Sequence, residues 1–336
     1  MTQPERLAIA MDWGGTWMRV AVVDWSGAIR WHKRRNNPKD KGKDSLLAAG
    51  LELLRQAVGA CSSHPVAGIG LAIAGPVDAE AGALSGSPQF PALEGVPLKA
   101  LWEPELGLPI FLGNDANLAA LGEYHHGAGQ AVTDDEGQLV RTLVYATVST
   151  GIGGGVVDRG ELLLGAHGLA AEIGHMAIDW RPDAPPCFCG SQGCLESIAS
   201  GTAIARAARQ RRLEPRWRHS TSLSGLAEEA VTAPAVFQAA QAGDLLASQM
   251  VEEVVQALSV GLASVLHLYD PDLLVLGGGV TQGLADLAKL PEIQRRMRVR
   301  VMSDGYRQCP LVPAKLGDNV GLVGAACLVW QRLDAR

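Results

Sequence analysis

The chain has 336 residues, of which 47% are hydrophobic and 19% are charged. This length and apolar content predict a folded protein of about two domains, and they exclude a disordered chain. Lys and Arg number 29 against 35 Asp and Glu, so general binding to nucleic acid phosphates is disfavoured. No run of about 18 uncharged apolar residues occurs, so we predict neither a membrane span nor a secretory signal, and we expect a cytoplasmic protein.

The same order of elements occurs twice, about 136 residues apart. Each copy has a strand, a turn of glycine and other small residues, a second strand and an Asp-Gly turn. The first copy has strands at 7–11 and 20–23 around the turn 12–16, and the second has strands at 143–148 and 156–157 around the turn 149–155. A repeat of this length predicts two homologous domains, in a duplicated α/β fold with a cleft between the domains.

Hydrophobic patterns predict further elements along the chain. We expect strands at 66–74, 108–112 and 272–276, and helices at 116–125, 197–212 and 234–268. A small N-terminal domain is expected over 1–113 and completed by 317–336, with a large domain over 114–316. The basic run 33–43 contains Asn36, Asn37 and Pro38, so it is predicted to be a solvated loop.

Three glycine-rich turns each follow a strand, at 12–16, 149–155 and 277–279. The free backbone N–H groups of such turns form concave sites for anions, phosphate above all. A single strand that ends in Gly-Gly is often only a tight turn, but three of them favour a nucleotide. The Walker lysine pattern is missing, and no Gly-x-Gly-x-x-Gly follows these strands, so neither of those two nucleotide motifs applies.

Five motifs stand in a characteristic order along the chain. They are Asp12-x-Gly-Gly-Thr-x-x-Arg19, Gly113-Asn-Asp-Ala-Asn117 with Ala120-Leu-Gly-Glu123, Ser149-Thr-Gly-Ile-Gly-Gly-Gly155, Glu172-Ile-Gly-His175, and Cys187-x-Cys-Gly-x-x-Gly-Cys-Leu-Glu196. Over essentially the whole chain, this order resembles the ROK (repressor, open reading frame, kinase) family of bacterial sugar kinases. The resemblance implies the actin-like ATPase fold of hexokinase, Hsp70 and actin. It also implies phosphoryl transfer from ATP with Mg²⁺ to a sugar hydroxyl, usually in a homodimer.

Asp115 is the candidate catalytic base. A sugar hydroxyl is barely acidic, so a kinase needs a carboxylate that takes its proton as charge builds on the attacking oxygen. Asp115 follows a strand at a helix start, where an ordinary helix-capping aspartate would also be found. The neighbouring Asn114 offers a donor and an acceptor to a sugar hydroxyl, which fits a binding site better than a cap.

The nucleotide is expected on the glycine turns. In the resembled family, Asp12 approaches the magnesium and the phosphates, although it could be a simple turn aspartate. Arg19 could contact phosphate or only be a surface charge. The expected nucleotide residues are Asp12, Gly14, Gly15, Thr16, Arg19, Thr150, Gly151, Gly153, Gly277 and Gly278.

The sugar is expected at Glu172 and His175, which would share a face of a helical turn. The resemblance places both near the anomeric carbon, and Glu196 could add a contact. Ala171 replaces a glycine of the family, a small change that leaves Glu172 in place. Some fructokinases of the family carry proline there, so alanine favours an aldohexose. The full set is Gln89, Asn114, Asp115, Glu172, His175 and Glu196, with Gln89 in place of an asparagine that often faces sugar.

A cysteine cluster predicts structural zinc. Cys187, Cys189 and Cys194 lie within eight residues, and His175 completes a tetrahedral set of four ligands. Four protein ligands leave no position for water, so the zinc would hold the loop and take no part in catalysis. We expect loss of a ligand to damage sugar affinity and local order, and to spare nucleotide contacts on the glycine turns.

The leading hypothesis is an ATP-dependent hexose kinase acting at the primary hydroxyl, with glucose as the first choice. The nearest alternative is an N-acylmannosamine kinase. A sugar-responsive repressor is disfavoured, because only eleven residues precede Asp12 and a helix-turn-helix domain needs more. An actin-like or chaperone-like ATPase is also disfavoured, because such proteins need no zinc cluster and no sugar-binding residues.

Overall fold

The computed structural model describes residues 6–38, 42–61, 64–131 and 140–334. The chain forms two compact units, the first from 1–140, 155–170 and 315–336, and the second from 141–154 and 171–314. The first unit therefore extends beyond the expected domain change near residue 113, because the helix that follows this point packs against the last helix of the chain. The domain ranges themselves stay a prediction.

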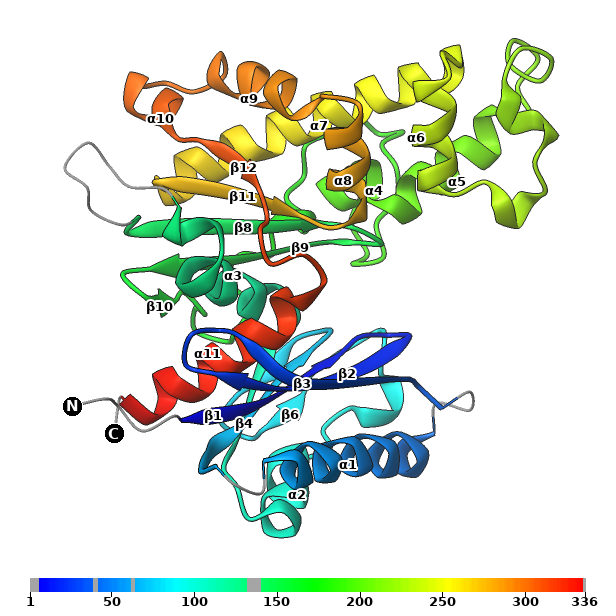
Figure 1. The fold of residues 1–336 in the computed structure, drawn as a ribbon. Coiled ribbons are helices and arrows are strands. Elements are labelled where there is room, and N and C mark those ends of the chain that lie inside the picture. The colour runs from blue at the N-terminus through cyan, green and yellow to red at the C-terminus, as the bar shows by residue number, and fades with distance from the viewer. Residues whose placement is uncertain (1–5, 39–41, 62–63, 132–139, 335–336) are drawn as a thin grey trace. The chain divides into compact units, whose positions relative to one another are not determined.

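The first unit is built on a five-stranded sheet in the order β3-β2-β1-β4-β7 (Figure 1). The strands are β1 (Leu7–Trp13), β2 (Trp17–Asp24), β3 (Ile29–Asn36), β4 (Val66–Ile73) and β7 (Ile110–Asn114). β1 and β2 pair antiparallel around the first glycine turn, as predicted. β4 runs parallel to β1 and β7, so the chain turns at the ends of β1, β4 and β7 share one edge of the sheet.

Helices cover both faces of this sheet (Figure 1). α1 (Lys43–Ala60) and α2 (Leu98–Leu106) lie on one face, and α11 (Val320–Asp334) lies on the other, where α3 (Asp115–His126) packs against it. The core on the α1 side contains Trp13 between Phe90 and Trp102, with ring centroids 5.4 and 5.9 Å from that of Trp13. A two-stranded ribbon, β5 (Val77–Asp78) with β6 (Ala83–Leu84), follows β4.

A second five-stranded sheet has the order β10-β9-β8-β11-β12. Its strands are β8 (Thr142–Val148), β9 (Ile152–Asp158), β10 (Glu161–Leu162), β11 (Leu273–Gly277) and β12 (Leu311–Pro313). The strand, turn and strand of β8 and β9 repeat those of β1 and β2, so the predicted repeat is confirmed. β11 runs parallel to β8 and β12.

Two of the predicted helices are wrong in extent, because each is interrupted by a capping residue. Ser200 separates α4 (Leu195–Ala199) from α5 (Gly201–Arg211), and its hydroxyl accepts the N–H of Ala203. Gly243, at a φ of 87°, and the capping residue Asp244 separate α6 (Ala233–Gln241) from α7 (Leu245–Tyr269). A side chain that caps a new helix ends the previous one, so an apolar pattern that continues past it is misleading.

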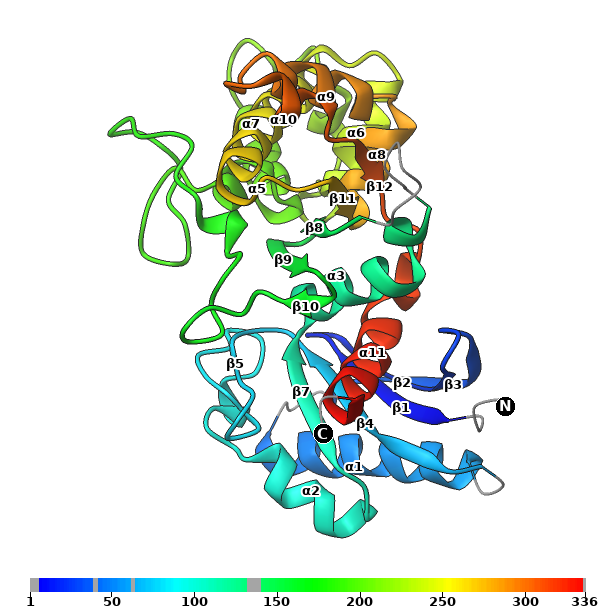
Figure 2. The same ribbon diagram turned by 90° about the vertical axis from the view of Figure 1, so that its left-hand side faces the viewer.

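α7 is the one helix of the described chain that is long and apolar enough to cross a membrane by length and composition. Most of its apolar side chains are buried within the protein, as in the core helix of a globular domain. α7 packs against α4, α5, α6 and α9 (Leu290–Arg298), and Figure 2 shows α6 and α9 beside it. α8 (Gly279–Asp286) packs against β8 and β11, and α10 (Asp304–Gln308) precedes β12.

Candidate functional site

The first glycine turn is fixed by Asn37. The indole N–H of Trp13 donates to Asn37 Oδ1 over 3.0 Å, and Asn37 Nδ2 donates to the carbonyl of Gly14 over 2.9 Å. Asn37 is only 8% exposed, and the basic residues before it belong to the exposed strand β3. The predicted solvated loop is therefore wrong for 33–37, whereas Lys39 and Lys41 lie outside the described residues.

Asp12 is buried at the start of this turn and forms an ion pair with Arg19. Arg19 also donates to the carbonyl of Asp318, so it is not a mere surface charge. Burial raises the pKa of Asp12, and the charge and hydrogen bond of Arg19 oppose that rise. A Cβ on Gly321 of α11 would lie 2.7 Å from Asp12 Oδ2, so the last helix approaches this carboxylate directly.

Gln89 lies over the same turn. A Cβ on Gly15 would be 2.3 Å from Gln89 Oε1, so a side chain at 15 would displace Gln89. Thr16 is exposed beside it. The structure thus brings Gln89, expected at the sugar, next to a turn expected to hold phosphates. The neighbouring Phe90 and Leu93 are buried in the core and act as packing residues.

Asn114, and not Asp115, caps helix α3. The Oδ1 atom of Asn114 accepts the N–H groups of Ala116 at 2.9 Å and Asn117 at 3.2 Å, and its Nδ2 donates to the carbonyl of Gly75 at 3.0 Å. We expected Asn114 to fit a sugar site better than a helix cap. That expectation is wrong in one respect, because Asn114 does cap α3. Asp115 is the first residue of the helix, directly after β7, and its Oδ1 accepts from the N–H of Ala116.

In the second unit, His175 and the three cysteines of the predicted zinc site lie together. One ligand atom from each residue lies within 4.8 Å of those of the others. Cys189 Sγ is 3.8 Å from Cys194 Sγ, and Cys187 Sγ is 3.6 Å from His175 Nδ1. Tetrahedral zinc with ordinary bond lengths separates two sulfur ligands by about 3.8 Å, and sulfur from nitrogen by about 3.6 Å. These two separations therefore match those expected of tetrahedral zinc.

The thiols of this cluster differ in environment. Burial raises the pKa of Cys194 to about 12, and it also raises the pKa of Cys187. Cys189 is exposed, and the N–H of Ser191 holds the pKa of its thiol below the usual value. Zinc binds thiolates, so its binding would release the protons of the buried thiols. The loop requires glycine at position 193, since a Cβ there would lie 1.7 Å from the carbonyl oxygen of Asp179.

Glu172 precedes the short helix Ile173–His175. Desolvation by the surrounding chain raises the pKa of Glu172, the charge of His175 opposes that rise, and the charge of Glu196 adds to it. The three side chains therefore belong to one local group in the second unit. Zinc at Nδ1 of His175 would leave Nε2 for another partner.

Ala171, next to Glu172, has a φ of 65° and is almost fully buried. This left-handed region suits glycine and disfavours residues with a Cβ. The replacement of the family's glycine is therefore not the small change that we expected, because it places backbone strain directly before a candidate sugar ligand.

Replacing Ala171 with glycine should stabilise the protein by about 1 kcal/mol, because it removes the Cβ from a left-handed conformation. Denaturant unfolding of the purified variant measures this. Ala170→Gly is the matched control, since residue 170 has no positive φ, and it should destabilise the protein. Equal or lower stability of Ala171→Gly would show that position 171 is not strained.

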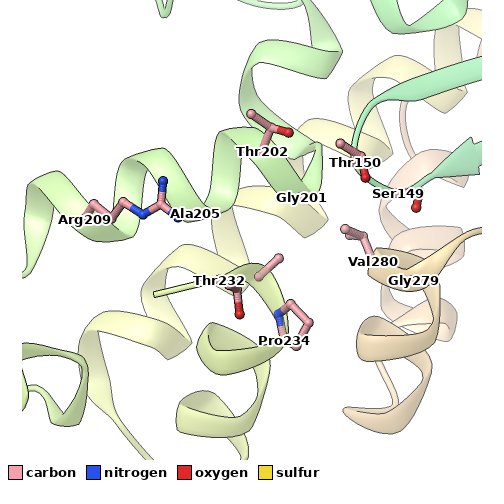
Figure 3. A pocket seen from close by; sticks show the side chains of 11 residues that line it. Ser149, Thr150, Gly201, Thr202, Ala205, Arg209, Thr232, Pro234, Gly279 and Val280 are labelled. Carbon is pink, nitrogen blue, oxygen red and sulfur yellow. The ribbon is translucent and has the colours of Figure 1, made fainter. Parts of the chain in front are cut away.

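A cavity of about 450 Å³ opens in the second unit (Figure 3). It is lined by the β8–β9 turn, by one side of α5 and by the starts of α6 and α8. These residues are Ser149 and Thr150 of the turn, Gly201, Thr202, Ala205 and Arg209 of α5, Thr232, Ala233 and Pro234 at the start of α6, and Gly279 and Val280 of α8. The N-termini of α5, α6 and α8 at one cavity provide positive potential, which favours a phosphorylated ligand.

Only one of the predicted nucleotide residues lines this cavity. Thr150 lines it, whereas Gly277 is buried, with Tyr145 Oη 2.2 Å from where its Cβ would be. Gly278 caps α8 at a φ of 92°. Gly279 lines the cavity; it belongs to the predicted glycine turn 277–279 but was not among the expected nucleotide residues. No local pattern marks the lining residues of α5 and α6, because they meet the β8–β9 turn only through the tertiary fold.

Arg209 is the one charged side chain among the residues that line this cavity. Its Nε donates to the carbonyl of Glu228 over 3.0 Å, which fixes the plane of the guanidinium group. Figure 3 shows Arg209 and the turn of Ser149 and Thr150 at opposite ends of the cavity. Arg209 is eight positions after Gly201 in α5, which corresponds to a distance of about 12 Å along the helix.

A family model described as the ROK family matches residues 8–332. The chain belongs to the ROK family. The glucokinase of Thermotoga maritima is 33% identical to this ROK protein over 330 residues, which are 98% of this chain and 99% of the relative. The N-acetylmannosamine kinase of Citrobacter koseri is 34% identical over 324 residues, 95% of this chain and 97% of that enzyme.

Solved structures of ROK proteins share the fold. The ROK hexokinase from Thermus thermophilus has a TM-score of 0.81 and 32% identity, with 98% of this chain and all of that chain covered. The ROK family glucokinase from Streptomyces griseus, in complex with glucose and AMPPNP, has a TM-score of 0.75 and 32% identity, covering 97% and 99%. This ROK protein accordingly has the actin-like ATPase fold of the ROK sugar kinases, as predicted.

Proposed function

We propose that this ROK protein transfers a phosphoryl group from ATP to the primary hydroxyl of a hexose, with glucose as the preferred sugar. The observation that carries the proposal is the full-length similarity to the Streptomyces griseus glucokinase, which was solved with glucose and AMPPNP. The cavity at the β8–β9 turn supports the proposed nucleotide site.

In this proposal, the adenosine occupies the cavity and the phosphates lie toward the β8–β9 turn. Arg209, at the far end from that turn, faces the base. A guanidinium group held in one plane binds a purine by stacking on the ring, a contact that adds affinity at small ordering cost. Ser149 and Thr150 mark the phosphate end, together with Gly151 and Gly153 of the same turn. Asp12, Gly14, Gly15, Thr16 and Arg19 form the proposed phosphate contacts of the first unit.

Asp115 takes the proton of the attacking hydroxyl in the proposed reaction. Asn114 supports this role, because it caps α3 and the carboxylate of Asp115 is therefore not needed as the helix cap. The proposed sugar-binding residues are Gln89, Asn114, Glu172, His175 and Glu196. Carboxylate, amide and imidazole groups together match the donors and acceptors of a hexose.

Two metal ions belong to the proposal. The carboxylate of Asp12 is the type of oxygen ligand that would hold Mg²⁺, and the ion would supply positive charge to neutralise the transferred group. Zinc would be held by His175, Cys187, Cys189 and Cys194 and would fix the loop and the imidazole ring, with no part in the chemical step. The homodimer remains a proposal from the family resemblance. The cytoplasmic location and the domain ranges 1–113, 114–316 and 317–336 remain proposals from the sequence pattern.

The substrate is tested by a coupled assay of ADP release with glucose, mannose, fructose, N-acetylglucosamine and N-acetylmannosamine. We expect the highest kcat/KM with glucose. A preference for N-acetylmannosamine would select the alternative that the Citrobacter koseri enzyme represents. Release of ADP with none of the five sugars would contradict the proposed function.

A further inference from the structure

Glu196 contacts the turn that is proposed to hold the phosphates. Its Oε2 atom accepts the N–H of Ile152, the first residue of β9, over 2.7 Å. A Cβ on Gly151 would lie 2.6 Å from the same oxygen, so the carboxylate lies directly against the turn. A carboxylate that accepts a backbone N–H forms one of the stronger hydrogen bonds in proteins.

The rest of the turn is held by the segment that follows Glu196. The N–H of Gly201 donates to the carbonyl of Ser149 over 2.7 Å, and the N–H of Thr202 donates to that of Thr150 over 3.2 Å. Within the turn, the N–H of Ser149 donates to the carbonyl of Gly151. The short stretch from Glu196 to Thr202 therefore forms hydrogen bonds with three residues of the turn, Ser149, Thr150 and Ile152.

The same stretch is attached to the predicted zinc ligands. Cys194 stands two residues before Glu196 and immediately precedes α4. The N–H of Leu195 donates to the carbonyl of Met176, next to His175, over 2.9 Å. Arg206 of α5 donates to the carbonyls of Ser197 and Pro186, and Pro186 precedes Cys187. Two independent routes thus connect the cysteine loop with the elements around the nucleotide cavity.

We propose that Glu196 is a positioning residue for the nucleotide, in addition to its proposed contact with the sugar. Its carboxylate holds the turn at 149–152 in the conformation that receives the phosphates and links that turn to the cysteine loop. The inference rests on the proposed function. It also changes our expectation about zinc, because loss of a cysteine ligand should weaken nucleotide binding as well as sugar binding.

The test is the affinity of the zinc-loaded protein for AMPPNP, measured by calorimetry without sugar. Glu196→Ala should bind AMPPNP about tenfold more weakly, since the loss of a hydrogen bond to a charged group has an effect of at least this size. Glu196→Gln should bind nearly as the unaltered protein does, because its amide oxygen still accepts the N–H of Ile152. Glu172→Ala is the matched control, a neighbouring carboxylate proposed for the sugar alone, and should leave the affinity unchanged.

A second readout follows the contact itself. Hydrogen exchange of the Ile152 amide should be faster in Glu196→Ala and protected in Glu196→Gln. If Glu196→Ala fails to fold, Glu196→Asp tests the same point, because its shorter side chain does not reach Ile152. Unaltered AMPPNP affinity in the shortened variants, or equal weakening in Glu172→Ala, would overturn the inference while the proposed function stands. Failure of the unaltered protein to bind AMPPNP would overturn both.

Discussion

Asp115→Asn should reduce kcat by a factor of about a hundred or more and leave the Kd for the sugar nearly unchanged. The amide keeps the shape of the side chain and an oxygen that accepts the N–H of Ala116, as Asp115 does. It cannot take up the proton of the sugar hydroxyl. The fold at this point should survive, because the cap of α3 is Asn114. Steady-state kinetics and a sugar titration on the same preparation measure both quantities.

The control for this prediction is Asp44→Asn. Asp44 is also an aspartate in the first turn of a helix, α1, and it is exposed to solvent. Its substitution should leave kcat unchanged, so a loss seen only at position 115 cannot be a general effect of a first-turn amide. A near-normal kcat in Asp115→Asn would remove this residue from the role of base.

The second large effect is expected from Cys189→Ala. The purified variant should lose stoichiometric zinc, melt at a lower temperature and bind sugar about tenfold or more weakly, since the proposed zinc would orient His175 and the Cys194 segment that leads to Glu196. The Cys189 thiol is exposed, so its removal leaves no cavity in the core that could explain a loss of stability. Metal analysis, a thermal melt and separate titrations with sugar and AMPPNP provide the four measurements.

Ser191→Ala is the control in the same loop, since Ser191 is exposed and is not one of the four candidate ligands. It should retain zinc and sugar affinity. If the unaltered protein, purified under reducing conditions, holds no zinc, the metal assignment is wrong. If Cys189→Ala loses zinc but binds sugar normally, the link between the loop and the sugar site is wrong.

The sequence predicted the sheets better than the helices. Strands β1, β2, β8 and β9 are short apolar runs that end at glycine turns, so their limits are visible locally. The helical patterns from 197 and from 234 are also apolar and periodic, but Ser200 and Asp244 act through hydrogen bonds to the backbone that hydrophobic periodicity does not record. Their capping role is seen only in the structure, where the chain turns between two helices.

The candidate site was predictable where its residues lie close together in the sequence. The cysteine cluster is the clearest case, because three ligands lie within eight residues and the fourth is twelve residues upstream. Asn37 could not be recognised, since its partners Trp13 and Gly14 lie more than twenty residues away and its own surroundings are polar. The strain at Ala171 was equally hidden, because a φ angle depends on the loop and not on the residue.

The nucleotide cavity required the fold. Its lining combines a turn predicted from glycine content with residues from three helix starts, and only Thr150 belonged to the predicted set. Glu196 was predicted as an additional sugar contact beside Glu172 and His175. Its bond to Ile152, 44 positions earlier in the chain, depends on how β9 and α4 pack. Contacts at such separations are fixed by tertiary structure. A sequence motif can therefore identify a functional residue, but it does not identify the residues that contact it.

The most direct test of the central claim is identification of the product by phosphorus NMR after incubation of the purified protein with ATP, Mg²⁺ and glucose. The account predicts one equivalent of glucose 6-phosphate for each ADP formed, with no phosphate at another hydroxyl and no ADP when glucose is left out. Free phosphate and ADP without a sugar phosphate, or a phosphate on a different hydroxyl, would contradict it.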